Sequence, residues 1–113
     1  MLTKENLGQF TGTENYYRHW LNFVYTDGVK FMAEKAGAYW LLDAIGSYQP
    51  EVKDIPFQLW KLEVAEDNTA VLTMREDSDR PAIITQKIGF TDFPLPEMKL
   101  YFIDGVLLLP SEY

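Results

Sequence analysis

Strict alternation of apolar and polar positions dominates the second half of the chain. Between residues 57 and 90, three such runs are separated by turn-forming clusters at residues 66–69 and 77–81. One alternation class is apolar, and the other carries lysine, glutamate, threonine and arginine. This pattern is typical of an antiparallel meander with one wet face, on which opposite charges of neighbouring strands can pair. We therefore predict strands over residues 57–65, 70–76 and 82–90.

A hairpin is predicted after the meander. Asp104 and Gly105 separate two apolar runs, at residues 98–103 and 106–109. Both residues tolerate the positive φ of a type I′ turn, so this dipeptide between apolar runs is a strong indication of a two-residue hairpin loop.

The apolar phase of residues 27–48 predicts two helices rather than one. Val29 and Met32 lie on one helical face, whereas Leu41 and Ile45 lie on nearly the opposite face of the same helix. A straight helix would be apolar all round, which a small soluble domain can hardly bury. A break at Gly37 lets both stripes face one core. We predict two short helices, or one kinked helix, with a cap at Thr26 or Asp27.

The remaining segments complete an α+β prediction. Residues 3–10 fit a short capped helix, and the alternating aromatic stretch at residues 16–25 fits one strand or extended edge. Pro50 is expected to close the helical part, because proline disfavours helix in the preceding residue. Helices followed by strands predict one α+β domain over residues 1–113, with the helices packed on one face of an antiparallel sheet.

Composition and charge narrow the function classes. Hydrophobic residues make up 47% of the chain and aromatic residues 15%, which favours a folded domain over a disordered one. The absence of cysteine excludes disulfides and thiolate chemistry. The net charge of −7 disfavours nucleic acid and anionic membranes as partners. With no signal-peptide pattern at the start and no long apolar run, we expect a cytoplasmic protein.

The motifs of common enzyme classes are missing. No phosphate-binding loop and no dinucleotide-binding glycine pattern occurs, and none of Ser47, Ser78 and Ser111 lies in a nucleophile elbow. His19 is the sole histidine, so a typical transition-metal site would need carboxylates for all its other ligands. We expect no cofactor and no metal.

Three residues remain as candidates for acid–base chemistry: His19, Asp27 and Asp43. A lone histidine is more often a structural hydrogen-bonding ring than a base, although its pKa range would allow proton transfer near neutral pH. Asp43 stands out as a carboxylate inside the apolar helical run at residues 39–45. Either it is an ordinary solvent-facing residue, or it is a half-buried acid that binds a cationic group or acts as a base.

An aromatic group near these acids is the candidate binding surface. Aromatic side chains dominate interface energetics, but they are equally good core material. The candidate binding residues are Tyr16, Trp20, Tyr39, Trp40 and Asp43.

Six motifs resemble those of a known family. They are QFTGTE at residues 9–14, YTDGV at 25–29, AYWLLDAI at 38–45, FQLWKL at 57–62, FTDFPL at 90–95 and DGVLLLPSEY at 104–113. Together they resemble a family of small bacterial proteins catalogued as a domain of unknown function and associated with plasmids, phages and other mobile elements. The resemblance covers nearly the whole chain. It implies a stand-alone accessory protein, and it brings no activity or functional residues.

Three hypotheses about function follow. The first is a non-enzymatic module that docks on a protein partner through the aromatic surface. The second is a binder of a planar or cationic small molecule, anchored by Asp43. The third is an acid–base enzyme that uses His19 with Asp27 or Asp43, which requires these groups to lie within hydrogen-bond reach. An edge strand at residues 16–25, or the final hairpin, could also pair two copies into a homodimer.

Overall fold

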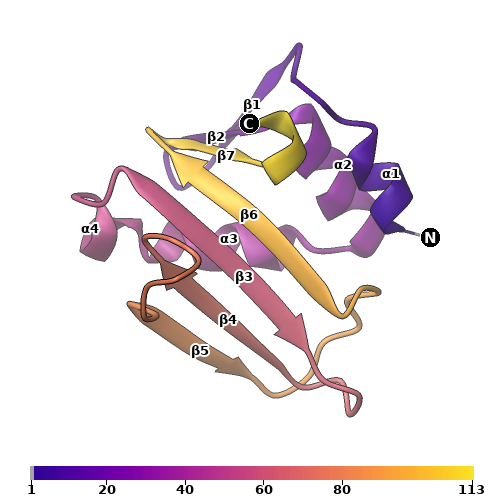
Figure 1. Ribbon diagram of the computed structural model, residues 1–113. Helices are drawn as coiled ribbons and strands as arrows, with labels where there is room; N and C mark the ends of the chain where they lie inside the picture. Colours follow the sequence, from indigo (N-terminus) through magenta and orange to yellow (C-terminus); the bar gives the residue numbers. More distant parts are fainter. Residues whose placement is uncertain (1) are drawn as a thin grey trace.

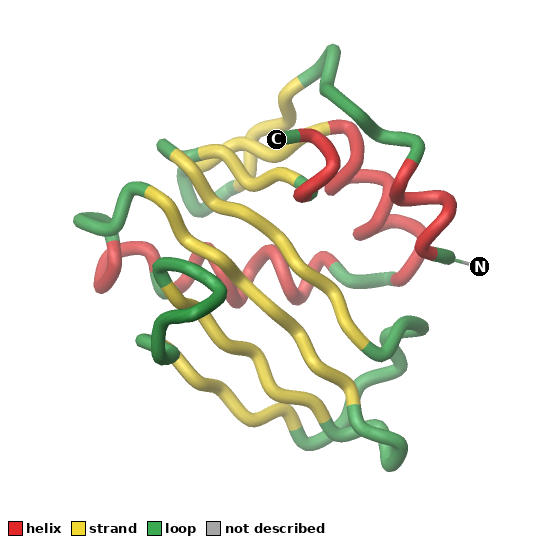
Figure 2. Tube along the Cα trace, in the orientation of Figure 1, coloured by secondary structure: helices red, strands yellow, loops and turns green. Residues whose placement is uncertain are grey.

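One seven-stranded sheet organises the protein, which we describe from a computed structural model covering residues 2–113 (Figures 1 and 2). The strands are β1 (Tyr16–His19), β2 (Phe23–Thr26), β3 (Phe57–Val64), β4 (Ala70–Arg75), β5 (Ile84–Ile88), β6 (Glu97–Ile103) and β7 (Val106–Leu108). The helices are α1 (Lys4–Gly8), α2 (Asp27–Ala36), α3 (Tyr39–Ser47), α4 (Gln49–Val52) and a final 3₁₀ turn, η1 (Pro110–Glu112). The prediction of the α+β class is confirmed.

The sheet is mixed, so the prediction of a purely antiparallel sheet is wrong. The strand order is β1-β2-β7-β6-β3-β4-β5, and β2 pairs with β7 in parallel while every other pair is antiparallel. The meander predicted for β3, β4 and β5 is present, but β6 joins the sheet on the other side of β3. Alternation reports which face of a strand is buried. It does not report which neighbour the strand takes.

The two-helix prediction is confirmed. Thr26 caps α2 through its side chain, which accepts a hydrogen bond from the Val29 backbone N–H at 3.3 Å. Gly37 follows α2 in the left-handed region, with φ of 61°, and α3 begins at Tyr39. A residue with a Cβ would be strained there, so Gly37 allows the change of direction that the two apolar stripes require.

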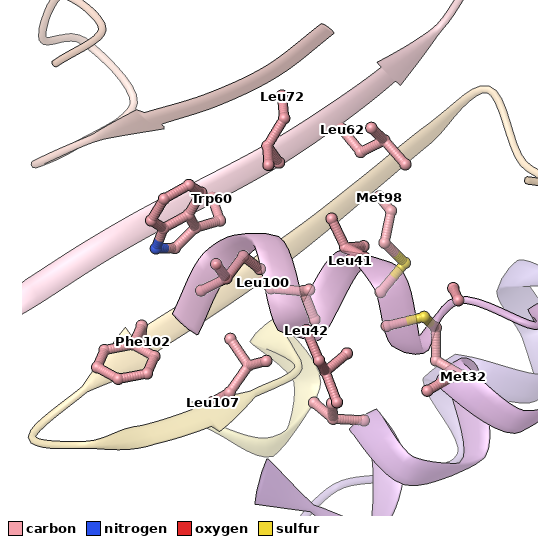
Figure 3. Close-up of a cluster of buried hydrophobic side chains, with 14 of the residues drawn as sticks. Met32, Leu41, Leu42, Trp60, Leu62, Leu72, Met98, Leu100, Phe102 and Leu107 are labelled. Atoms are coloured by element: carbon pink, nitrogen blue, oxygen red, sulfur yellow. The ribbon is translucent and has the colours of Figure 1, made fainter. Parts of the chain in front are cut away.

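Both helical stripes and the apolar faces of the strands meet in one core (Figure 3). Ten of the most deeply buried large side chains come from α2, α3 and four strands: Met32, Leu41, Leu42, Ile45, Trp60, Leu62, Leu72, Met74, Leu100 and Leu107. Leu2 and Leu109, each 1% exposed, join them from outside these elements. Full burial of each such side chain contributes about 1.5–3 kcal/mol of transfer free energy. The prediction that the helices pack on one face of the sheet is not confirmed, because they form no single clear layer. Helix α3 crosses behind the sheet, whereas α1 lies to its side near η1 (Figure 1).

Two local predictions are wrong. Residues 16–25 form a hairpin rather than one strand, because Asn22 adopts φ of 72° and its N–H bonds the His19 carbonyl at 3.1 Å. Asparagine tolerates this left-handed conformation better than most residues do. The chain also continues into α4 across Pro50, since a proline in the first turn of a helix loses no intrahelical hydrogen bond.

A buried amide links α4 to the sheet. The Gln58 side chain, 1% exposed, donates to Gln49 Oε1 at 3.0 Å and to the carbonyls of Val52 and Ile55, each at 3.2 Å. Its Oε1 accepts from Gln49 Nε2 and from the indole of Trp60, both at 2.9 Å. Because a buried amide without partners is costly, these bonds fix the end of the helical segment against β3.

Candidate functional site

The turn between β1 and β2 faces α3 and brings three candidate residues into direct contact. Asp43, on α3, receives two hydrogen bonds on the same oxygen. His19 Nε2 lies 2.7 Å from Asp43 Oδ1, and the indole Nε1 of Trp20 donates to that oxygen at 3.2 Å. These contacts join residues more than twenty positions apart, so they depend on the fold and not on local sequence.

The hydrogen bonds of His19 assign its tautomer. The Leu21 backbone N–H donates to Nδ1 at 3.0 Å, so Nδ1 carries the lone pair and Nε2 carries the proton that is donated to Asp43. The side chain is only 5% exposed, and its ring stacks on Phe23 with centroids 4.4 Å apart. Both nitrogens of the neutral ring are therefore occupied, and His19 has no lone pair available for a substrate.

Asp43 has one oxygen for further contacts. The carboxylate is 49% exposed, and among residues 2–113 its hydrogen bonds use only Oδ1. Tyr39 precedes it by one helical turn and therefore lies on the same face of α3. Burial raises the pKa of Tyr39 to about 12, helped by the nearby charges of Tyr25 and Glu34, so Tyr39 is neutral at physiological pH.

Trp20 is the most exposed aromatic side chain of this surface. It is 76% exposed although its ring stacks on His19, with centroids 5.7 Å apart, and its indole N–H is bonded to Asp43. With Arg18 and Asn22 it lines a shallow depression of about 390 Å³. We call Trp20, His19, Tyr39 and Asp43 the Trp20 site.

Comparison with known proteins gives a family and no activity. The family DUF6876, described as a family of unknown function, matches residues 1–113. The chain belongs to this family. No curated protein and no solved structure matches it.

Two of the predicted binding residues lie away from the Trp20 site. Tyr16 and Arg18 project from the face of β1 opposite that of Tyr17 and His19, because side chains alternate along a strand. Trp40 lies in a separate depression, together with Ile88, Phe90, Thr91 and Asp92. The structure thus joins Trp20 to Asp43, places Tyr39 one helical turn before Asp43, and leaves Tyr16 and Trp40 apart from them.

Asp27 is committed to a different set of bonds. Its carboxylate accepts from the Tyr17 hydroxyl at 2.8 Å and from the backbone N–H groups of Glu14 and Asn15 at 3.0 and 3.2 Å. These bonds, that of Tyr17 first, lower the pKa of Asp27 to about 2. They hold the segment before β1 against the start of α2. The partner of His19 is Asp43 and not Asp27.

Sequence reasoning missed Arg18 and Asn22 as part of this surface. The signal for Asn22 was an asparagine within an aromatic, β-favouring stretch, where it is a turn former. For Arg18 the sequence offered no signal, since its place beside the depression lined by Trp20 and Asn22 follows from the hairpin. Among the described residues no group of three His, Asp or Glu side chains is placed to hold a metal ion. Within residues 2–113 the helices are all too short or too polar to cross a bilayer.

Proposed function

We propose that this DUF6876 chain is a non-enzymatic accessory module that binds a protein partner through the Trp20 site. The observation that carries the proposal is a tryptophan that is 76% exposed and yet held in place by a hydrogen bond to Asp43 and by stacking on a buried histidine. Because this indole is mostly exposed, its hydrogen bond and stacking contact orient it toward solvent and do not pack it into the core.

Preorganisation is what makes such a side chain effective in binding. Tryptophan is among the residues most enriched at the energetic centres of interfaces. Fixing a mobile side chain on binding costs about 0.5–1.5 kcal/mol, and Trp20 has already been fixed by folding. The free oxygen of Asp43 and the partly exposed ring of Tyr39 add one polar and one apolar group to the same surface.

The occupied nitrogens of His19 support a binding role over an enzymatic one. A general base must offer a lone pair to the proton it removes, and Nδ1 is already an acceptor for Leu21 N–H. His19 instead has a structural role: its Nε2–H donates to Asp43 and its ring stacks on Trp20, and these contacts orient both side chains. We place this accessory role in the cytoplasm of a cell carrying a mobile element.

The test is affinity capture from host lysate with matched variants. Trp20→Ala removes the anchor, and Tyr113→Ala removes an aromatic side chain that is equally exposed, at 76%, elsewhere on the molecule. We expect wild type and Tyr113→Ala to retain the same partner, and Trp20→Ala to lose it while keeping the wild-type circular dichroism spectrum. A partner that all three proteins capture equally would contradict the proposal.

A small-molecule role is the second candidate. It is favoured by the unbonded Asp43 Oδ2 next to the indole of Trp20, with Tyr39 one helical turn away, an arrangement that suits a cationic planar group. Native mass spectrometry of gently purified protein tests it. Extra mass that is released on denaturation, and that is lost in Asp43→Ala, would favour this candidate. A bare subunit mass would favour the protein-binding role.

A further inference from the structure

β1 is an outer strand of the sheet, and two of its residues, Tyr16 and Arg18, have backbone and side-chain groups without partners in the part of the chain that the structure describes. Strand order places β1 beyond β2, with no strand on its other side among the described residues. Tyr16, 61% exposed, and Arg18 project from the same face of this strand. Neither side chain makes a hydrogen bond or ion pair with any residue of the described range.

The register of the hairpin shows which backbone groups of β1 point to the open edge. Arg18 lies opposite Val24, and the Val24 N–H donates to the Gly105 carbonyl at 3.0 Å, on the side of β7. Residues directly opposite each other in an antiparallel pair either both exchange hydrogen bonds or both turn away. The N–H and C=O of Arg18 therefore point away from β2, and those of Tyr16, two residues earlier, do the same.

We propose that two copies of this chain pair along β1, antiparallel and across a two-fold axis at Tyr17. In this register Arg18 of one copy lies opposite Tyr16 of the other, and each such pair exchanges both of its backbone hydrogen bonds. The two sheets become one continuous sheet through the dimer. The proposal does not rest on the function assigned to the Trp20 site.

Charge and existing hydrogen bonds disfavour the other two registers. Centring the pair on Arg18 places two guanidinium groups directly opposite each other, and like charges there are destabilising. Centring it on Tyr16 requires Glu14 to pair with the second copy, but the N–H groups of Glu14 and Asn15 already donate to Asp27. The ladder must therefore end at Tyr16, which leaves the register centred on Tyr17.

The side chains are complementary in that register. Each Arg18 guanidinium lies across from the exposed ring of Tyr16 in the other copy, so the same cation–π contact forms twice. One strand of four residues gives a small interface, so the association is weak and reversible. The net charge of −7 on each copy opposes it at long range, and salt therefore strengthens the dimer by screening that repulsion.

Sedimentation equilibrium of the full chain, from about 10 µM to about 1 mM, tests the proposal across the affinity range of weak interfaces. We expect a concentration-dependent dimer. Arg18→Pro removes the outward N–H, and proline is tolerated on an edge strand when its N side faces solvent. It should raise the dissociation constant by at least about tenfold, whereas Arg18→Ala, which keeps the N–H and loses the cation, should raise it by less. A wild-type protein that stays monomeric throughout, or an unchanged dimer in Arg18→Pro, would overturn the proposal.

Amide hydrogen exchange on wild-type protein gives a second readout that needs no variant. The amides of Tyr16 and Arg18 should exchange more slowly at high protein concentration than at low concentration. Those of Tyr17 and His19, which face β2, should be protected at both. Exchange of Arg18 that is independent of protein concentration in a solution containing dimer would place the contact elsewhere and refute the β1 assignment.

Discussion

At the residue scale, Asp43 connects the buried part of the molecule to its surface. One carboxylate oxygen accepts from a histidine that is 5% exposed and from a tryptophan that is 76% exposed. The buried His19 N–H needs an acceptor, because an unpaired buried donor is costly. The same oxygen, Asp43 Oδ1, also accepts from the Trp20 indole and so fixes the orientation of that side chain on the surface.

The first prediction concerns removal of this acceptor. Asp43→Ala leaves the His19 Nε2–H without its partner, and it should lower the free energy of unfolding by about 1–3 kcal/mol. Asp43→Asn keeps an acceptor oxygen and should cost less. Urea denaturation of the three proteins measures the difference. Equal stability of Asp43→Ala and wild type would show that the contact does not hold His19.

The pH dependence of Asp27 gives a second prediction. Its pKa is about 2 in the folded protein against 3.8 for the ordinary carboxyl, so the carboxylate stabilises the fold above pH 3.8. That contribution is lost as the pH falls from 3.8 through about 2. The difference in thermal midpoint between wild type and Asp27→Asn should therefore be largest near neutral pH and shrink across this range. A difference that is independent of pH would contradict the assigned hydrogen bonds.

A third prediction tests the close approach at Gly28. A Cβ at this position would lie 2.6 Å from Leu109 Cδ1 and 2.8 Å from the Glu112 carboxyl carbon. Gly28→Ala should therefore destabilise the fold by about 1–3 kcal/mol, the usual cost of overpacking. Gly12→Ala is the control, since a Cβ at Gly12 meets nothing within 4 Å. Equal melting temperatures for the two variants would refute the packing argument.

At the element scale, the start of α2 is held by residues from the far end of the described chain. Glu112, in η1, accepts from the Thr26 hydroxyl at 2.6 Å and from the Gly28 N–H at 3.1 Å. A carboxylate at a helix N-terminus also interacts favourably with the helix dipole. This contact holds η1, which follows β7, against the junction of β2 and α2.

The fourth prediction follows from that contact. Glu112→Ala leaves the Gly28 N–H and the Thr26 hydroxyl without this acceptor, and it should reduce stability by about 0.5–2 kcal/mol, the range of helix capping effects. The stability of Glu112→Gln, which keeps an acceptor oxygen without the charge, should lie between those of wild type and Glu112→Ala. Hydrogen exchange at Gly28 should accelerate in parallel. Unchanged protection of that amide in Glu112→Ala would contradict the capping role.

The elements that the sequence predicted well are those with a strong local signal. Gly37 marked the break between α2 and α3, and Asp104 and Gly105, with φ of 50° and 79°, marked the last hairpin. The first hairpin was missed because Asn22 sits inside an otherwise continuous β-favouring stretch. The sheet order and the parallel β2–β7 pair were also out of reach, because pairing depends on long-range contacts that alternation does not encode.

The candidate site likewise combines features that have a local sequence signal with features that depend on long-range contacts. Trp20, Tyr39 and Asp43 could be chosen as unusual residues, but their meeting depends on the hairpin that turns Trp20 toward α3. Trp40, the immediate neighbour of Tyr39, faces a different depression, because adjacent residues on a helix do not share a face. Residue types therefore indicated the chemistry, and only the fold could sort which residues act together.

At the scale of the whole molecule, the two proposed contact regions lie at one end of the sheet. The Trp20 site lies where the β1–β2 turn meets α3, and the open edge of β1 lies beside it. Neither region interrupts the core, which is built from α2, α3 and the apolar faces of the strands. Surface variants at Trp20 or Arg18 should therefore fold normally, and this separates loss of binding from loss of structure.

Calorimetric titration with the captured partner measures whether Trp20 anchors that partner. Wild type and Tyr113→Ala should bind with the same dissociation constant. Trp20→Ala should weaken binding by at least about 2 kcal/mol, the level that defines an interface hot spot. Equal affinity of all three proteins would contradict the claim and remove the Trp20 site as the functional surface.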